Sequence, residues 1–353
     1  MRSTTIRWTA LAALLVTLAA CGGDGGDDAE GTEQSGELFD FPLGSFNGEI
    51  YVLDYVAVDQ GFFEENGLNV TFISPQQGGA SANTLFLGGT LKGWPGNPAP
   101  IMVNISKGED IKIAGWLDNW IPFQLVVPED SELAGMTDAS FDEKMEALRG
   151  KQVGLTAIGS LVYQSLVAGL TASGVPESDV TIIAVGQPDS GMGQMEAGRI
   201  DAYVTYSRTD TEIFAERVNT VEFVSLTGEE APEEIRSFSA YALPVLNTLV
   251  EENPEVVEGY VNAQKQAHEW VQENVEEAAQ IVADQIYNGQ YTEIIDDALN
   301  RLLEAEQPYE FKVNPETWQN HMQLLVDQGQ IEESAVDALE YDKVVLPDAQ
   351  VSE

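Results

Sequence analysis

Cysteine, histidine and basic residues are scarce in this chain of 353 residues. It has one cysteine, two histidines, and 16 lysines and arginines against 59 aspartates and glutamates, for a formal charge of −43. A single cysteine excludes an intrachain disulfide and a thiolate metal site, and with only two histidines we expect no zinc or iron site. Because no basic stripe exists to release counterions, we expect no nucleic acid or anionic membrane surface as the main partner.

Motifs for catalysis and nucleotide binding are missing as well. The sequence contains no GxxxxGKS/T loop, no GxGxxG segment and no GxSxG elbow. Both histidines, His268 and His321, fall in predicted C-terminal helices beside apolar positions, where a structural role is the ordinary one. Close pairs of acids carry little information in a chain this acidic. The sequence therefore predicts no catalytic residue, no metal and no cofactor, and we expect that the protein is not an enzyme.

The N-terminus has the layout of a secretory signal. Arg2 and Arg7 flank the start of an apolar run, Trp8 to Ala20, which is too short to span a bilayer as a mature helix. The run ends in Leu18-Ala19-Ala20-Cys21, which resembles a bacterial lipobox and implies that Cys21 becomes the lipidated first residue. We expect a signal peptide over residues 1–20 and an exported, lipid-anchored protein. The alternative is an ordinary signal peptide with a chance cysteine.

A polar, acidic stretch follows the cysteine. Residues 21–40 are rich in Gly, Asp, Glu, Ser, Thr and Gln, a composition that cannot bury a core and is typical of a flexible tether. The spacing of Asp24, Asp27 and Asp28 does not match a calcium-binding EF-hand loop. Beyond the tether, a hydrophobic content of 43 % is enough for about two domains of ordinary size. The acidity fits a salt-rich medium or an exported protein.

Hydrophobic periodicity predicts α/β structure over the first two thirds and helices after that. We expect strands and helices that alternate and therefore parallel βαβ units, with strands at 48–53, 68–72, 111–115, 123–127, 153–155, 180–185 and 201–206. The β-branched run 180–185 predicts a buried strand. The C-terminal part is expected to hold helices at 254–272, 275–287, 292–306, 315–328 and 331–340. Asn253-Pro254 and Asn314-Pro315 each predict a capped helix start.

Glycine-rich or aromatic turns follow several of these strands. They lie at residues 75–80, 94–97, 116–120, 157–160, 187–190 and 206–208. In open α/β sheets, ligands bind beyond the carboxyl ends of strands, where glycines admit close approach and helix N-termini favour negative groups. Trp94, Trp116 and Trp120 cluster in this region and suit a flat or apolar ligand. Plain chain reversal for each turn, and core packing for the tryptophans, are the competing interpretations.

Several segments together resemble a known family. They are Gly61-Phe62-Phe63 with Gly67-Leu68-Asn69-Val70, Lys107-Gly108-Glu109-Asp110-Ile111-Lys112, Leu148-Arg149-Gly150-Lys151-Gln152-Val153-Gly154, Gly198-Arg199-Ile200-Asp201-Ala202 and Asn253-Pro254-Glu255. Their order and spacing from about residue 46 to 290, behind a lipobox, resemble the ABC-transporter solute-binding lipoproteins. The similar branch serves nitrate, sulfonates, taurine and thiamine-pyrimidine precursors.

This resemblance implies a type II periplasmic-binding-protein fold. It has two α/β lobes joined by two crossovers, with a helical C-terminal part, and the ligand lies between the lobes. Lobe I would comprise 41–127 and 237–353, and lobe II would comprise 128–236. The implied partners are an ABC permease and ATPase, and we expect a monomer. Carried over by position, the ligand-binding residues would be Tyr51, Asp54, Tyr55, Gly78, Gly79, Trp94, Gly96, Asn97, Asn119, Trp120, Gly159, Ser160, Tyr206, Ser207 and Arg208.

The chain departs from the family's pattern at two expected ligand contacts, Leu91-Lys92-Gly93-Trp94-Pro95 and Tyr206-Ser207-Arg208. Arg208 is suited to pair a carboxylate, sulfonate or phosphate, or to form a salt bridge with a surface acid. The ligand class therefore stays open between planar solutes such as pyrimidines and anionic ones such as sulfonates. Two other functions also remain open, a ligand-sensing lipoprotein of the same fold and an enzyme similar to pyrimidine-precursor synthases.

Overall fold

The computed structural model describes residues 37–75, 78–118, 122–236, 240–304 and 311–351. The predicted signal peptide, Cys21 and most of the predicted tether lie outside these described residues. Residues Glu37–Glu353 form one compact unit. Within the described part of this unit, no helix combines the length and the apolar character that crossing a membrane requires.

The first strand lies earlier in the chain than the sequence analysis predicts. β1 (Phe39–Gly44) pairs in parallel with β2 (Leu68–Ile73), and Phe41 and Leu43 of β1 are fully buried. Residues 48–53, predicted as a strand, instead form a 3-10 turn (Glu49–Tyr51) and the start of helix α1 (Val52–Asp59), followed by α2 (Phe62–Glu65). A continuous run of buried residues is compatible with a strand and also with a helix that is enclosed on all sides. The apolar pattern therefore does not distinguish a helix from a strand here.

Two helices and a second pair of strands complete this part of the molecule. α3 (Gly78–Leu87) and α4 (Pro98–Ser106) precede β3 (Ile111–Asp118), which pairs antiparallel with β9 (Ala240–Leu246). The β9 strand is missing from the sequence-based prediction. It brings a segment of the last third of the chain against the first third, and an isolated bridge joins its Ala242 to Gly96.

The middle of the chain forms a five-stranded sheet in the order β6-β5-β7-β4-β8. Its strands are β4 (Gln124–Pro128), β5 (Gln152–Leu155), β6 (Thr181–Ala184), β7 (Ala202–Thr205) and β8 (Thr220–Ser225). β5 is parallel to β6 and β7, whereas β4 runs antiparallel to β7 and β8. The expectation of purely parallel units is therefore wrong for β4. The expected burial of β6 is also wrong, because it is an edge strand whose residues are exposed or half-buried.

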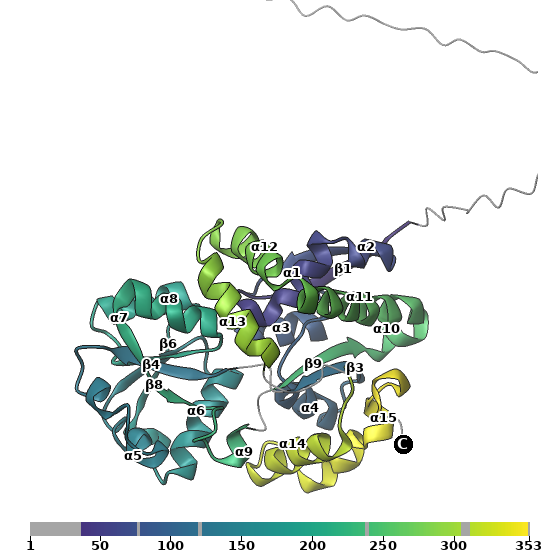
Figure 1. Cartoon of the computed structure of the whole chain (residues 1–353). Coiled ribbons are helices and arrows are strands. Elements are labelled where there is room, and N and C mark those ends of the chain that lie inside the picture. The colour runs from purple at the N-terminus through teal and green to yellow at the C-terminus, as the bar shows by residue number, and fades with distance from the viewer. Residues whose placement is uncertain (1–36, 76–77, 119–121, 237–239, 305–310, 352–353) are drawn as a thin grey trace, which may run out of the picture. The chain divides into compact units, whose positions relative to one another are not determined.

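Helices surround this sheet on the left of Figure 1, in teal. They are α5 (Phe141–Glu146), α6 (Leu161–Ala172), α7 (Pro188–Glu196), α8 (Arg208–Val218) and α9 (Glu233–Arg236), with 3-10 turns at Leu133–Met136 and Glu177–Asp179. The chain enters this region between β3 and β4 and leaves it between β8 and β9. Two passages of the chain therefore connect it to the part that contains β1, β2, β3 and β9.

The C-terminal third is helical, as predicted. α10 (Asn247–Glu252), α11 (Pro254–Glu273), α12 (Val275–Tyr287), α13 (Thr292–Glu304) and α14 (Pro315–Asp327) are followed by α15 (Tyr341–Val344) and a 3-10 turn at Pro347–Ala349. Asn314 caps α14 by accepting from the N–H groups of Glu316 and Thr317, whereas Asn253 makes no such side-chain bond. The predicted helix 331–340 is a 3-10 segment, Glu333–Leu339.

Both histidines are buried in this helical part. His268 lies on α11, and His321 on α14 packs edge-on against Trp116 with ring centroids 5.4 Å apart. Burial lowers the pKa of each imidazole to about 4, so both are neutral at ordinary pH. This placement agrees with the structural role that the sequence favours.

Candidate ligand-binding pocket

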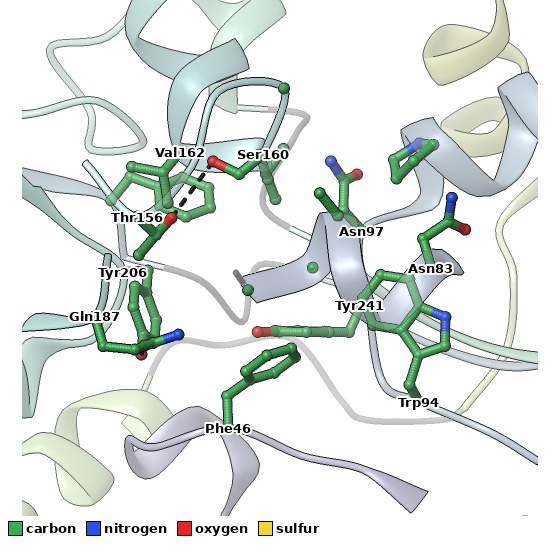
Figure 2. Close-up of a pocket in the computed structure, with 18 of the residues that line it drawn as sticks. Phe46, Asn83, Trp94, Asn97, Thr156, Ser160, Val162, Gln187, Tyr206 and Tyr241 are labelled. Atoms are coloured by element: carbon green, nitrogen blue, oxygen red, sulfur yellow. Dashed lines mark hydrogen bonds between the residues drawn. The ribbon is translucent and has the colours of Figure 1, made fainter. Parts of the chain in front are cut away.

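A pocket lies between the five-stranded sheet region and the part that contains β9 (Figure 2). Its cavity volume is about 220 Å³, which suits a small solute. One wall comes from Thr156, Ser160, Leu161, Val162, Gln187 and Tyr206, with Gly159 beside them. The other wall comes from Phe46, Tyr51, Gly78, Gly79, Ala80, Asn83, Trp94, Gly96, Asn97, Pro100, Phe123 and Tyr241.

Four helices begin at this pocket. The first residue of α3 is Gly78, and the residues that precede α4, α6 and α7 are Asn97, Ser160 and Gln187. Asn97 Oδ1 accepts from the Ala99 N–H at 2.9 Å, and Ser160 Oγ accepts from the Tyr163 N–H at 3.3 Å. Helix starts present N–H donors and a partial positive charge, so the pocket is rich in neutral hydrogen-bond donors.

One side chain contact crosses the pocket near these helix starts. Asn97 Nδ2, from the wall that contains Trp94 and Tyr241, donates to Gln164 Oε1 on α6 at 3.5 Å. Both amides are neutral, so the contact joins the two walls without adding a charge. In this contact the Nδ2 group of the Asn97 amide is directed toward α6.

Aromatic side chains supply much of the remaining lining. The Tyr241 hydroxyl donates to the Tyr51 hydroxyl at 2.7 Å, and the two rings meet edge to face with centroids 5.4 Å apart. Phe46 packs on Tyr51, and the Tyr206 hydroxyl donates to Gln187 Oε1 at 2.8 Å. Burial raises the pKa of Tyr51, Tyr206 and Tyr241 well above its usual value. These phenols are therefore neutral donors and acceptors.

Gly96 leaves room for the indole of Trp94, and Gly79 lies against the same ring. A Cβ on Gly96 would overlap the six-membered part of that ring, and a Cβ on Gly79 would lie 3.5 Å from its Cζ3 atom. The Trp94 side chain is almost fully buried, at 2 % exposure, and it borders the cavity. A side chain at position 96 is therefore incompatible with the position of this ring, which forms part of the pocket surface.

Formal charge is absent from the described lining. None of the residues that line the pocket is an aspartate, glutamate, lysine, arginine or histidine. The three neutral amides Asn83, Asn97 and Gln187 and several hydroxyls provide its polarity. The arrangement suits recognition of a flat or apolar solute through ring contacts and neutral hydrogen bonds.

Residues 51–278 match the sequence family described as NMT1/THI5 like. The chain belongs to this family. No curated protein matches the sequence significantly. Among solved structures, a protein from Bordetella bronchiseptica is similar with 20 % identity and a TM-score of 0.69, over 88 % of this chain and 95 % of that one.

Two further structures similar to this NMT1/THI5-like chain are binding proteins. The alkanesulfonate-binding protein SsuA of Xanthomonas axonopodis, solved with MOPS, shares 14 % identity at a TM-score of 0.65, over 88 % of this chain and 99 % of that one. The periplasmic nitrate-binding protein NrtA of Synechocystis shares 15 % identity at 0.62, over 88 % and 86 %. The fold is that of periplasmic binding proteins, and the resemblance stated from the sequence is confirmed.

Nine of the residues predicted to bind ligand lie in the pocket lining of this NMT1/THI5-like protein. They come from five separate segments and are Tyr51, Gly78, Gly79, Trp94, Gly96, Asn97, Gly159, Ser160 and Tyr206. Asn119 and Trp120 lie outside the described residues. The structure thus brings together turns that the sequence places far apart, although their contact with a ligand stays a prediction.

Four other predicted site residues are engaged elsewhere. Asp54 accepts from Ser45 Oγ at 2.9 Å and Gln264 Nε2 at 2.5 Å, and Tyr55 donates to the Phe46 carbonyl at 2.7 Å. These side chains lie inside the helical layer because residues 48–53 form a helix start and not a strand that ends at the pocket.

The remaining two of the four are at the start of α8. Ser207 is its N-cap and accepts from the Asp210 N–H, while the Arg208 guanidinium lies 3.8 Å from Glu212 and 3.9 Å from Glu222. Neither side chain is part of the lining. The salt-bridge alternative weighed for Arg208 is the one that the structure shows.

Several lining residues are missing from the sequence-based list. Phe46, Asn83, Phe123, Thr156 and Tyr241 had no recognised turn or motif around them. Gln187 lies in one of the strand-end turns noted above and could have been included. Tyr241 could not, because β9 was not predicted and nothing local brings residue 241 next to residue 51.

Proposed function

We propose that this protein is the extracytoplasmic solute-binding component of an ABC importer, anchored by lipid on Cys21, and that it captures a small organic solute in the pocket. The observation that carries this proposal is an aromatic pocket with neutral donors, bounded by two parts of one compact unit. The family and the fold support it. An ABC permease and ATPase are the expected partners, and the protein would act as a monomer.

The two walls of the pocket correspond to the proposed lobes. The sequence analysis places the lobe boundary at 127/128, but β4 (Gln124–Pro128) belongs to the five-stranded sheet. We therefore assign 124–236 to lobe II and 41–123 with 237–353 to lobe I, with hinge closure around the solute. β1 begins at Phe39, so the proposed tether from residue 21 would end just before that strand. Pyrimidines, thiamine precursors and sulfonates are the ligand classes that the resemblance offers.

Binding without turnover is favoured by the chemistry of the lining. Its described residues provide hydroxyls and amides but no imidazole, thiol, amine or carboxyl group to act as a base. This supports a binding protein over the synthase-like alternative. A ligand-sensing lipoprotein would use the same pocket, and it would differ in having a receptor as partner in place of a permease.

Thermal unfolding with a ligand panel tests the proposal. The panel contains pyrimidines, flavins, aromatic and alkyl sulfonates, taurine and nitrate, added to a chain that begins after Cys21. A ligand at a hundred times its Kd adds about 2.7 kcal/mol to the free energy of unfolding. We expect a clear rise in Tm with one class and recovery of the compound unchanged. A well-folded sample that responds to none of the panel would contradict solute capture by this pocket.

A matched pair of glycine variants places the binding site. Gly96→Ala introduces a Cβ that overlaps the Trp94 ring, so the ring must move and ligand binding should be lost. Gly135→Ala is the control, because its Cβ would meet no atom within 4 Å. Equal binding by both variants would show that the ligand binds elsewhere.

The lipid anchor is tested separately. Cys21→Ser should abolish incorporation of a labelled fatty acid and release the protein from the membrane fraction, because the serine hydroxyl does not replace the thiol in lipid transfer. Unchanged labelling of the variant would refute the anchor at Cys21. The ligand-binding result does not depend on this outcome.

A further inference from the structure

Each of the three amide side chains that line the pocket has its oxygen engaged by the protein. Gln187 Oε1 accepts from the Tyr206 hydroxyl at 2.8 Å, and Asn97 Oδ1 accepts from a backbone N–H of α4 at 2.9 Å. Asn83 Oδ1 accepts from Asn104 Nδ2 at 2.9 Å. The group that each of these amides still offers to a solute is therefore its NH2 group, which can only donate.

The orientation of the Gln187 amide follows from the burial of Tyr206. This tyrosine is 8 % exposed, so its hydroxyl hydrogen needs an acceptor within the protein. Gln187 Oε1 is the acceptor that the structure provides. An inverted amide would leave this buried hydrogen without an acceptor, which costs free energy. Tyr206 therefore fixes which end of the Gln187 amide faces it and which end faces the solute.

The backbone around Gln187 is held as well. Its carbonyl accepts from the N–H groups of Ser190 and Gly191 at 2.9 and 3.1 Å, and the Tyr203 hydroxyl donates to the Gly186 carbonyl at 3.0 Å. Among the described residues, no acceptor lies within hydrogen-bond distance of Gln187 Nε2. In Figure 2 this nitrogen points into the space between the two walls of the pocket. The Gln187 side chain is thus a positioned donor with its acceptor missing.

Further donors lie on the opposite wall. The Tyr241 hydroxyl donates to the Tyr51 oxygen, and the Tyr51 hydrogen has no acceptor among the described residues. The buried Trp94 Nε1–H is likewise without an acceptor there. The four helix starts add N–H donors to the same lining. The side-chain acceptors that remain are hydroxyl oxygens, such as that of Thr156, so the described lining has more donors to offer than acceptors.

We propose that Gln187 is a specificity-determining residue and that Tyr206 is its positioning residue. Together they present an NH2 group to the solute, so that the pocket selects a flat ring whose substituent facing Gln187 is a hydrogen-bond acceptor, such as a carbonyl or a carboxylate. A substituent that only donates, such as an amidinium, is rejected because it would place N–H groups against N–H groups. This inference rests on the proposed function and specifies the chemistry of the solute.

The first test compares ring compounds of nearly equal shape by calorimetric titration at constant ionic strength. Acetophenone and benzoate present only acceptors, whereas benzamidinium presents only donors. We expect the first two to bind at least about tenfold more tightly than benzamidinium, a difference of about 1.4 kcal/mol. The formal charge of −43 cannot produce this order, because it attracts the cation. Equal or tighter binding of benzamidinium would overturn this inference alone. Binding of none of the three to the folded protein would overturn the proposed function with it.

Three variants assign the selectivity to these two residues. Gln187→Glu replaces the NH2 group by an oxygen at nearly constant shape and should reverse the preference in favour of benzamidinium. Tyr206→Phe keeps the ring and lets the Gln187 amide turn its oxygen to the solute, so the ratio of acetophenone to benzamidinium affinity should fall about tenfold. The control is Tyr163→Phe, which removes a hydroxyl that donates to Glu177 outside the lining, and its ratio should equal that of the wild type. A ratio that Gln187→Glu leaves unchanged would refute the role of Gln187, and one that Tyr206→Phe leaves unchanged would refute the positioning by Tyr206.

Discussion

Asp54 should make the stability of the folded protein fall as pH rises toward 8. Its carboxyl group is buried at 1 % exposure, and burial raises its pKa from 3.8 to about 7 despite hydrogen bonds from Gln264 and Ser45 that lower it. Between these two pKa values the Asp54 carboxyl group keeps its proton in the folded protein, whereas in the unfolded chain it has lost it. The contribution to the free energy of unfolding is therefore full below about pH 4 and is lost as the pH rises through 7.

The size of the effect follows from the two pKa values. Between about pH 5 and pH 8 the unfolded side chain stays ionised while the folded one loses its proton, which removes about 3 kcal/mol from the free energy of unfolding. Three other buried groups also change the stability of the wild type with pH. Asp210, whose pKa burial raises to about 8, acts in the same direction, whereas the neutral histidines weaken stability below about pH 6.5.

The assay is urea unfolding of the wild type and Asp54→Asn at several pH values. The difference between the two proteins cancels Asp210 and the histidines, so it should change by about 3 kcal/mol in favour of the variant from pH 5 to 8. Asp189→Asn, whose side chain is 83 % exposed, should show no such trend. A pH-independent difference for Asp54→Asn would mean that Asp54 is ionised in the folded state and would refute the reasoning.

Three further substitutions test the packing at two helical glycines and one hydrogen bond at the pocket. Gly259→Ala in α11 should destabilise the protein by about 1–3 kcal/mol, because the new Cβ would lie 2.5 Å from the Asn66 carbonyl oxygen. Gly193→Ala in α7 meets no atom within 4 Å and should stabilise it by up to about 1 kcal/mol; equal signs in urea unfolding would contradict this. Tyr241→Phe removes the hydrogen bond to Tyr51 and should cost about 1 kcal/mol in the same assay. An unchanged unfolding midpoint would show that the bond contributes nothing.

Local signals in the sequence predicted much of the fold. Alternating Leu68, Val70 and Phe72 marked β2, and the start and end of α12 agree with the predicted 275–287. The prediction was wrong where the structure of a segment depends on contacts with segments far away in the sequence. The buried stretch around Val52 forms a helix, and the strand that pairs with β2 is instead β1, which begins within the last two residues of the predicted tether. The edge position of β6 and the reversed direction of β4 are likewise properties of the whole sheet.

For the pocket too, residues in local sequence patterns were predicted, and residues placed by distant contacts were not. Turns rich in glycine led to Gly78, Gly96 and Gly159, because ligands of open α/β sheets bind beyond the carboxyl ends of the strands. Tyr241 and Phe46 were out of reach, since only the pairing of β3 with β9 and the course of the chain after β1 bring them there. Arg208 lies outside the described lining for a different reason. The sequence shows that a guanidinium is present but not which of many acids lies nearest.

The uncharged lining has a consequence for a protein with a formal charge of −43. Mobile ions crowd around its outer surface and weaken every interaction between charges that are exposed to water. Capture of a solute through amides, hydroxyls and rings does not use such interactions. Its affinity should therefore be nearly the same in dilute and in concentrated brine, so that the acidic exterior can adapt to salinity while the solute that is recognised stays the same.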